Sequence, residues 1–591
     1  MGSDLFVQSI NVFCALAKYP LFAETLTREG VISLVMSVLK KASFTDQVVN
    51  KIVDMIWSIL DVFPKAALYI GEASTASSLF KFLQEITLKG YRTKDKELRN
   101  EILILFSLFA REYDNQLILK EIGFMEYIAA LSIGLELYPE SVKVDYALST
   151  SEQDFEMTKL CWTILYYLTF TDECLDILTQ LGFLSLLLET ININGSMLSK
   201  WNETQKKELR VLSLKILLLL SVRVQQDFSK EQGARLCIEF LQSTGDEALL
   251  SSSFSLAMSI STCEQGCRDL FDAEALPFML ETSLDQTVSL GSRTDCIRVV
   301  SNICQHVEMA KNEFRLNGGI TMLLVLLEQC VKDGKDEQKD EFTFNTVDCS
   351  WSAIAGSSEN EKIFIEGDGI HYLLSVLTFA SDWIKLSVLG CVADLMKFNQ
   401  EAMEEVLTWK SKDKKDITSF LINMWREAEN SPVFAEYMTL ENVTIDPHDF
   451  DLHVKIYHVL SQMEERIDKN SLSDMDKMEL VKIFQFDNLL HDKAWEEISM
   501  ELEQEGIRPT TPDRERLHNK LHEKDDRSRK ISHGKTEIAK EMAGKVNQEE
   551  EVFYRTIIEQ AQKQPMLNVK ESAVQKRTKS RKPVILAPSY E

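Results

Sequence analysis

The chain has 591 residues, of which 45% are hydrophobic and 27% are charged, with only 22 glycines and 11 prolines. This composition is typical of a folded, helix-forming protein and excludes a low-complexity chain. The formal net charge of −27 repels phosphate backbones and anionic lipid headgroups, so we expect neither nucleic acid nor a membrane surface as a partner.

The beginning of the chain carries no recognisable export signal. Residues Met1–Leu5 lack the basic segment and apolar core of a secretory leader. The most apolar run, Val211–Val222, is shorter than the ~20 residues that span a bilayer and contains Lys215, so it predicts a buried helix. We therefore expect a soluble intracellular protein whose 11 cysteines are reduced and buried.

One pattern recurs along residues 1–430: a helix with a small or polar residue at its middle, a polar turn, and a second apolar helix led by glycine. The clearest copy is Cys296–Cys330, in which Gly318 and Gly319 follow a helix ending near Leu316. We call the residue at the middle of each first helix the register residue. The nine register residues are Ala15, Ser58, Ser107, Tyr167, Leu218, Ser259, Asn302, Ala353 and Asp394.

The spacing of the register residues predicts the fold. Their separations run from 41 to 60 residues and cluster near the ~40–47-residue period of armadillo and HEAT arrays. A helical bundle would show the same apolar periodicity but no constant turn position. We therefore predict an all-α, armadillo/HEAT-like superhelical solenoid over residues 1–430, with about nine degenerate repeats. Since the first repeat is incomplete, we expect an isoform or fragment of a longer protein, or a partner that covers the exposed end.

Glycines mark the turn of most repeats. Six of them lie 15 or 16 residues after their register residue, where glycine permits the positive φ of a helix terminus. Ser74, Ala275 and Lys410 occupy this position in the other three repeats, so we expect those turns to adopt a different backbone conformation. The six glycines are Gly30, Gly123, Gly182, Gly233, Gly318 and Gly369.

Pro432 and Pro447 interrupt the repeat pattern. Residues 431–506 predict a helical extension that packs against the last repeats. Residues 507–591 predict a largely disordered charged tail, in which residues 547–564 can form one helix on binding a partner.

The tail differs in charge from the rest of the chain. From Thr510 to Glu591 there are 18 Lys and Arg against 13 Asp and Glu, so an acidic body ends in a basic tail. Its last part is a candidate contact for an acidic surface. Ser532, which follows Arg529 and Lys530, is a candidate phosphorylation site whose modification would weaken that attraction. The basic residues of the last part are Lys563, Lys570, Lys576, Arg577, Lys579, Arg581 and Lys582.

Motifs for catalysis, nucleotides and metals are lacking. The sequence contains neither a P-loop nor a GxGxxG pattern. Cys263 with Cys267, and His518 with His522, have the spacing of paired metal ligands, but neither pair has a second pair at hand, so buried thiols and a solvated helix face are favoured. We expect no catalytic residue, no cofactor and no metal, and therefore no enzyme.

The histidines and asparagines of the array indicate neither a catalytic site nor a peptide-binding ladder. His306 and His371 are the only array histidines, and helix-surface or core positions explain them better than a catalytic triad. A ladder of asparagines holds extended peptides in many armadillo proteins, but Asn302 is the only asparagine among the register residues. Ordinary surface complementarity is therefore the expected mode of binding.

Three stretches resemble a known family. They are FRLNGGITMLLVLLEQC, IFIEGDGIHYLLSVLTFASDWIKLSVLGCVADLM and the ending RTKSRKPVILAPSYE, and they are similar to the cilia- and flagella-associated protein 69 family of armadillo-type proteins. The resemblance implies a non-enzymatic scaffold of the axoneme, in the central apparatus of the motile cilium or sperm flagellum, supporting flagellum assembly, stability and motility beside other axonemal scaffold proteins. The alternative is a soluble armadillo-type adaptor that binds linear peptides of signalling or transport clients.

Overall fold

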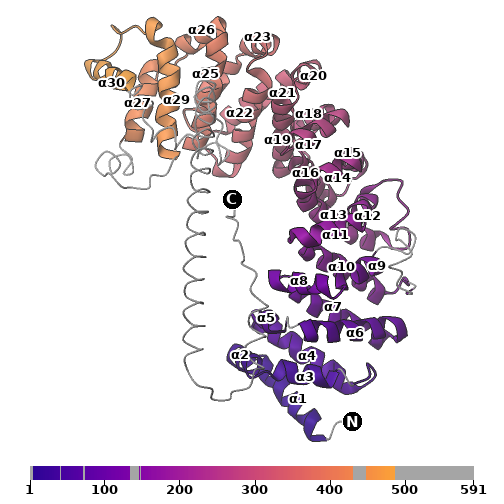
Figure 1. Cartoon of the computed structure of the whole chain (residues 1–591). Coiled ribbons are helices and arrows are strands. Elements are labelled where there is room, and N and C mark those ends of the chain that lie inside the picture. The colour runs from indigo at the N-terminus through magenta and orange to yellow at the C-terminus, as the bar shows by residue number, and fades with distance from the viewer. Residues whose placement is uncertain are drawn as a thin grey trace, which may run out of the picture. The chain divides into compact units, whose positions relative to one another are not determined.

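The computed structural model describes residues 4–39, 42–70, 73–132, 146, 148–429 and 448–485 (Figure 1). Internal contacts divide the chain into two units, and the second, residues 492–500 and 511–591, lies outside the described residues. The expected helix near 547–564 and the expected disordered tail, residues 507–591, lie outside the described residues as well. All described residues belong to the first unit.

Every regular element of the described residues is a helix, and the one β-bridge there, between Lys410 and Asp416, is isolated. This confirms the predicted all-α solenoid class. Among the same residues no single helix has both the length and the apolarity to cross a bilayer. Two bent pairs, Asp172–Gln180 with Phe183–Ile191 and Ala310–Leu316 with Gly319–Asp333, reach the required length and composition only when each pair is taken together.

Residues 4–429 contain nine successive groups of three helices, each with a long, a short and a third helix. The long helices are α1 Asp4–Ala17, α4 Gln47–Val62, α7 Thr93–Phe109, α10 Glu152–Leu168, α13 Glu203–Arg223, α16 Glu247–Ile260, α19 Leu290–His306, α22 Asp340–Ile354 and α25 Asp382–Phe398. The short helices are α2 Pro20–Arg28, α5 Ala66–Ile70, α8 Tyr113–Glu121, α11 Asp172–Gln180, α14 Gln225–Lys230, α17 Glu264–Asp272, α20 Ala310–Leu316, α23 Ser358–Glu366 and α26 Gln400–Thr408. The third helices are α3 Val31–Leu39, α6 Ala73–Lys89, α9 Phe124–Ser132, α12 Phe183–Ile191, α15 Gly233–Ser243, α18 Ala275–Leu284, α21 Gly319–Asp333, α24 Gly369–Val376 and α27 Ile417–Glu429.

Each register residue lies in one of the nine long helices, but in the carboxyl-terminal half of that helix and not at its middle as expected. The expected unit of two helices is also wrong. In the clearest copy the sequence suggested a single helix up to Leu316. Instead α19 ends at His306, Val307 adopts an extended conformation with φ −116°, and α20 begins at Ala310. The break turns the chain so that Ala310 and Phe314, one turn apart on α20, are both buried.

The turn before the third helix uses positive φ in most units. Gly30, Gly123, Gly182 and Gly318 have φ between 71° and 78°, as their position after the register residue suggested. In two turns the left-handed residue is instead the one before the glycine: Gln232 with φ 56° and Asp368 with φ 62°. Glycine is therefore not the only residue that this chain places in the left-handed conformation.

Where a non-glycine residue takes the left-handed conformation before a glycine, that glycine is required because a Cβ there would collide with an aromatic ring. A Cβ on Gly233 would lie 2.3 Å from the ring of Phe228, five residues earlier. Gly369 stands in the same relation to Phe364, at 2.5 Å. These glycines begin their helices beneath an aromatic ring, and no larger residue fits there without a shift of that ring.

The expectation for Ala275 is wrong, because Glu274 before it has φ 55° and closes the turn in the same left-handed conformation. The turn at Lys410 does differ in conformation, as expected. Lys410 and Asp416 form the isolated bridge, and in the loop between them Lys414 has a φ of 62°. The expected difference at Ser74 stays a prediction, since the residues just before α6 lie outside the described ones.

The long helices pack against one another in chain order, and this row continues beyond residue 430 (Figure 1). Helix α29, His448–Met463, packs against α25 and α27, and Gln462 donates a hydrogen bond to the Ala393 carbonyl at 3.0 Å. A 3-10 turn follows at Glu464–Arg466, and a similar turn at Glu337–Lys339 precedes α22. Helix α30, Asp474–Gln485, then contacts α27 and α29, and Arg426 pairs with Asp476 at 2.7 Å.

Candidate protein-interaction surfaces

The register residues lie along the row of long helices, and contacts join several of them to the neighbouring helix. The guanidinium of Arg111 lies over the ring of Tyr167, 5.3 Å from its centroid. The Ser259 hydroxyl donates to the Leu218 carbonyl at 3.0 Å. Asn302, the one candidate for a peptide-holding amide, donates to the Ser261 hydroxyl at 2.9 Å. Its amide nitrogen therefore has an internal partner.

The register residues differ in exposure. Ala353 is fully buried, and Asp394 is 6% exposed and accepts a hydrogen bond from the indole of Trp351 at 2.9 Å. Leu218, in contrast, is 37% exposed, so a partner protein can reach the row at this residue.

We call the partly or fully exposed aromatic and apolar residues at the ends of the contacting helices α10 and α13 the aromatic patch. It comprises Tyr166, Tyr167, Phe170, Leu218 and Val222. The ring centroid of Tyr166 lies 5.5 Å from that of Tyr167 and 5.2 Å from that of Phe170, while Phe170 is 49% and Val222 is 46% exposed.

An ion pair and a hydrogen bond position the two halves of the patch. Arg223 at the end of α13 pairs with Asp172 and donates to the carbonyl of Thr169, just beyond α10. Aromatic residues next to arginine are the composition in which interface hot spots are enriched, and exposed apolar clusters mark interaction sites.

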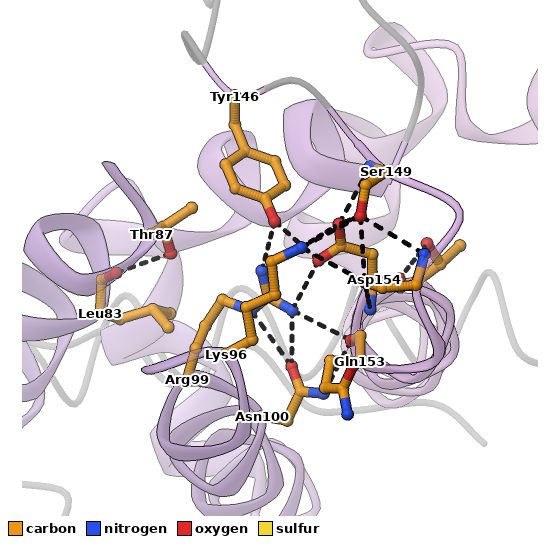
Figure 2. A network of polar contacts seen from close by, with 11 residues as sticks. Leu83, Thr87, Lys96, Arg99, Asn100, Tyr146, Ser149, Gln153 and Asp154 are labelled. Carbon is orange, nitrogen blue, oxygen red and sulfur yellow. Dashed lines mark hydrogen bonds and ion pairs between the residues drawn. The ribbon is translucent and has the colours of Figure 1, made fainter. Parts of the chain in front are cut away.

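Close to this patch in the chain, a buried polar network joins α7 to α10 (Figure 2). Asp154 is fully buried, and its carboxylate lies 2.8 Å from the ammonium of Lys96 and 3.0 Å from the guanidinium of Arg99. The hydroxyl of Tyr146 donates to the same carboxylate at 2.7 Å, and the Ser149 backbone N–H donates at 2.9 Å. Residues from three separate stretches of chain therefore converge on one carboxylate.

The network keeps Asp154 charged. Burial by itself would raise the pKa of Asp154, but hydrogen bonds from Lys96, Ser149 and Tyr146 outweigh burial and hold the pKa well below its usual range. Burial and the hydrogen bond to Asp154 raise the pKa of Tyr146 to about 12. A carboxylate that stays ionised and a phenol that stays protonated hold helices together but do not exchange protons near neutral pH.

We call the concave surface between α15, the end of α17 and α18 the acidic groove. Its volume is about 750 Å³. The sequence did not point to it, because its carboxylates come from helices of two successive units and share no motif. Its lining residues are Arg235, Ile238, Glu239, Gln242, Asp272, Ala273, Glu274, Pro277, Phe278 and Glu281.

The cysteine pair weighed as metal ligands has structural roles. The sulfur of Cys263 caps α17 and accepts a hydrogen bond from the Gly266 N–H at 3.3 Å, while the Cys267 thiol donates to the Ser261 carbonyl at 3.0 Å. Within the described ranges no group of three or more His, Cys, Asp or Glu is placed to hold a metal ion. His518 and His522 lie outside those ranges.

The remaining candidates for chemistry do not come together. All 11 cysteines are free, and burial raises the pKa of Cys161, Cys237 and Cys304 to about 12, so these thiols stay protonated. His306 ends α19 and His371 lies in α24, each exposed on its own helix surface. The candidate phosphorylation site Ser532 and the basic tail residues Lys563, Lys570, Lys576, Arg577, Lys579, Arg581 and Lys582 all lie outside the described residues.

A family model described as "Cilia- and flagella-associated protein 69, ARM repeat" matches residues 10–252 and 263–435, well over half of the chain. The chain belongs to the cilia- and flagella-associated protein 69 family. The family resemblance found in the sequence is thereby confirmed, and the matched residues run from α1 to the end of α27.

Curated members of the cilia- and flagella-associated protein 69 family are distant relatives. The protein from Callithrix jacchus is 21% identical over 566 residues, covering 85% of this chain and 60% of the relative. The Homo sapiens protein is 20% identical over 526 residues, covering 78% and 55%. The chain therefore spans about 55–60% of the length of these relatives.

Among solved structures, the crystal structure of an engineered protein matches 78% of this chain and 96% of its own length, with a TM-score of 0.53 at 13% identity. At this identity the match supports the helical fold of this cilia- and flagella-associated protein 69 family member and carries no information on its function.

Proposed function

We propose that the chain is a non-enzymatic structural subunit of the motile cilium or sperm flagellum, held in the central apparatus of the axoneme. In this role it supports flagellum assembly, stability and motility through protein–protein contacts. The observation that carries the proposal is the family match over most of the array, because the matched relatives are named for association with cilia and flagella.

The array suits a scaffold because its units pack in a continuous row. Neighbouring units fix one another's orientation, so surfaces on different units are presented at set spacings. The aromatic patch offers the anchor for a sibling scaffold protein: Phe170 and Val222 are about half exposed, while Arg223 holds the patch together.

Two features favour a structural subunit over a peptide-binding adaptor and over an enzyme. Asn302 is bonded to Ser261, so this register amide has an internal partner in place of a client backbone. The buried charged cluster around Asp154 holds its ionisation state fixed, which fits a role in rigidity. The basic tail residues are proposed to reach an acidic surface such as that of tubulin.

The proposal is tested by fractionating cilia that carry the tagged chain. A structural subunit resists detergent extraction and is released only at high salt, whereas an adaptor appears in the detergent-soluble fraction. Deletion of residues 563–591 is expected to reduce retention, most strongly at low salt, because it removes electrostatic contacts that salt screens. If the full chain is extracted quantitatively by detergent alone, the structural role is wrong; if the deletion changes nothing, the tail has no part in retention.

A further inference from the structure

The aromatic patch lies on two acid-free stretches of an otherwise acidic chain. Residues 160–171 and 209–224, which carry the patch on α10 and α13, contain no Asp or Glu, although the formal net charge of the chain is −27. The second stretch contains Arg210, Lys215 and Arg223. An incoming acidic group thus meets no carboxylate on the helix segments that carry the patch.

Arg111 adds a cation whose charge has no counterpart in the described body. It is exposed in the turn between α7 and α8, and its guanidinium lies over the ring of Tyr167, 5.3 Å from the centroid. Among the described residues no carboxylate lies within ion-pair distance of it. A guanidinium held over an aromatic face keeps N–H donors at its edge for a carboxylate, which it binds through two parallel hydrogen bonds. Tyr167 therefore orients Arg111 for an acid supplied from outside.

Helix α13 supplies a second cation beside apolar surface. Lys215, Leu218 and Val222 follow one another at intervals of three and four residues, so they lie on one exposed face of α13 over about 10 Å. Lys215 also lacks an ion-pair partner in the part of the chain that the structure describes. Arg223, in contrast, is paired with Asp172. The exposed face of α13 is thus an apolar stripe that begins with a cation.

The tyrosines of the patch add hydrogen-bond donors. Within the described ranges neither the Tyr166 nor the Tyr167 hydroxyl is bonded to another residue. A phenol that packs through its ring and keeps its hydroxyl available can donate to a carboxylate or carbonyl oxygen of a partner. Apolar surface, cations and donors therefore occur together at this patch.

Two arguments select the occupant of the patch. A twofold interface between two copies of the chain would set the patch against itself, so that Arg111 and Lys215 would face like charges. A partner with bulky apolar residues bordered by acids complements both the rings and the cations. A helix suits the stripe on α13, because its residues at i, i+3, i+4 and i+7 share one face over the same length.

We propose that the aromatic patch binds an acidic amphipathic helix of a partner protein. The apolar face of that helix packs on Phe170, Leu218 and Val222, and its acids pair with Arg111 and Lys215. This inference rests on the proposed scaffold function and names the chemistry of the partner that the patch anchors. The apolar contacts supply most of the affinity, while the charges select an acidic partner and make binding depend on salt.

Two synthetic helical peptides that differ only in charge test the proposal. Both carry leucines at i, i+3, i+4 and i+7, and the positions beside the leucines are glutamate in one peptide and lysine in the other. The purified full chain is titrated into each fluorescently labelled peptide, and anisotropy gives the affinity. The glutamate peptide is expected to bind at least about tenfold more tightly, and high salt is expected to reduce the difference. Since the net charge of the chain would favour the lysine peptide, this preference identifies a local basic surface.

Two charge-reversal variants with equal change in net charge provide the control. Arg111→Glu/Lys215→Glu is expected to weaken binding of the glutamate peptide by about tenfold and to strengthen binding of the lysine peptide. Lys65→Glu/Arg298→Glu, at exposed positions on other units, is expected to leave the preference unchanged. Equal thermal unfolding curves for the two variants ensure that the patch is still folded.

Several results would overturn the inference. They are a preference of the parent chain for the lysine peptide, no saturable binding of the glutamate peptide, or an equal loss in the two charge-reversal variants. Sedimentation of the chain alone tests the other occupant: a dimer that Phe170→Ala converts to a monomer would assign the patch to self-association. All these measurements use the purified chain in solution, so their failure is distinguishable from failure of the ciliary fractionation, which tests the proposed function.

Discussion

The ring of Phe314 occupies the space that a Cβ on Gly319 would need, because that atom would lie 2.4 Å from the ring. In the preceding unit, the residue that corresponds to Phe314 is the smaller Leu270, and the residue that corresponds to Gly319 is Ala275. The short helix and the third helix are therefore coupled through one pair of residues. The other pairs with a phenylalanine and a glycine at this spacing are Phe228–Gly233 and Phe364–Gly369.

Gly319→Ala is expected to lower the free energy of unfolding by about 1–3 kcal/mol, because it forces the Phe314 ring to move in a close-packed core. Phe314→Leu alone is expected to cost about 1 kcal/mol through the cavity that it leaves. In the double variant the alanine fits, so the two losses are not additive. Urea unfolding of the three variants gives the coupling energy. Strict additivity would contradict the proposed steric coupling.

At positions with positive φ, replacing glycine and introducing glycine are expected to change the free energy of unfolding in opposite directions. Gly318→Ala places a Cβ at φ 78° and is expected to lower the free energy of unfolding by about 1–2 kcal/mol. Gln232→Gly relieves the same strain at φ 56° and is expected to be neutral or stabilising, by up to about 1 kcal/mol. Melting temperatures compared at fixed pH provide the measurement. A lower melting temperature for Gln232→Gly would show that the turn carries no such strain.

Asp154→Asn leaves Lys96 and Arg99 without their buried counter-charge. Loss of one partner from a buried ion pair costs about 3–5 kcal/mol, so a marginal array is expected to unfold locally between α7 and α10. Hydrogen exchange of α7 and α10 would detect this local opening. Asp176→Asn, at an exposed position on α11, is the control and is expected to change nothing. Unaltered exchange in Asp154→Asn would contradict the structural role of the network.

The same carboxylate gives the stability a defined pH dependence. The pKa of Asp154 lies well below its unfolded value near 3.8, so its contribution is present in full above that value. The contribution is lost as the pH falls from about 4 through the lowered folded pKa. Urea titrations between pH 6 and pH 2.5 are expected to show a steeper loss for the parent chain than for Asp154→Asn. Parallel curves for the two proteins would refute this linkage.

The aromatic patch is expected to supply a binding hot spot. Phe170→Ala removes a ring that is 49% exposed, so folding stability is expected to stay within about 0.5 kcal/mol. Affinity for an axonemal partner is expected to fall by about 2 kcal/mol, or roughly thirtyfold. Leu284→Ala, at a residue 41% exposed on another unit, is the control for loss of exposed apolar surface. Equal retention of the parent and Phe170→Ala chains on isolated axonemes would exclude the patch from the interface.

The repeat could be predicted from the sequence, because in six units a turn glycine lies 15 or 16 residues after the register residue, although the units themselves differ in length. The short helix was missed at Val307, since no glycine or proline marks the break between α19 and α20. The packing of α29 on α25 agrees with the helical extension predicted for residues 431–506, although the sequence did not place α29 as the next member of the row of long helices.

The polar surfaces were harder to predict than the fold. Lys96 and Asp154 are 58 residues apart, and the length of the loop between α9 and α10 decides whether they meet. The acidic groove takes its carboxylates from α15, α17 and α18, so it depends on how two units pack. Neither feature has a local motif. Both follow from tertiary distances that spacing along the chain does not determine.

The packing of α29 on α25 has a consequence for shortened products of this chain. A product that ends shortly after Glu429 would lose the helix that covers α25, on which Val388, Cys391 and Val392 are fully buried. Its last helices would then expose an apolar surface of the kind that chaperones and proteases recognise. Premature termination there would accordingly reduce the abundance of the whole polypeptide, although every preceding unit is intact.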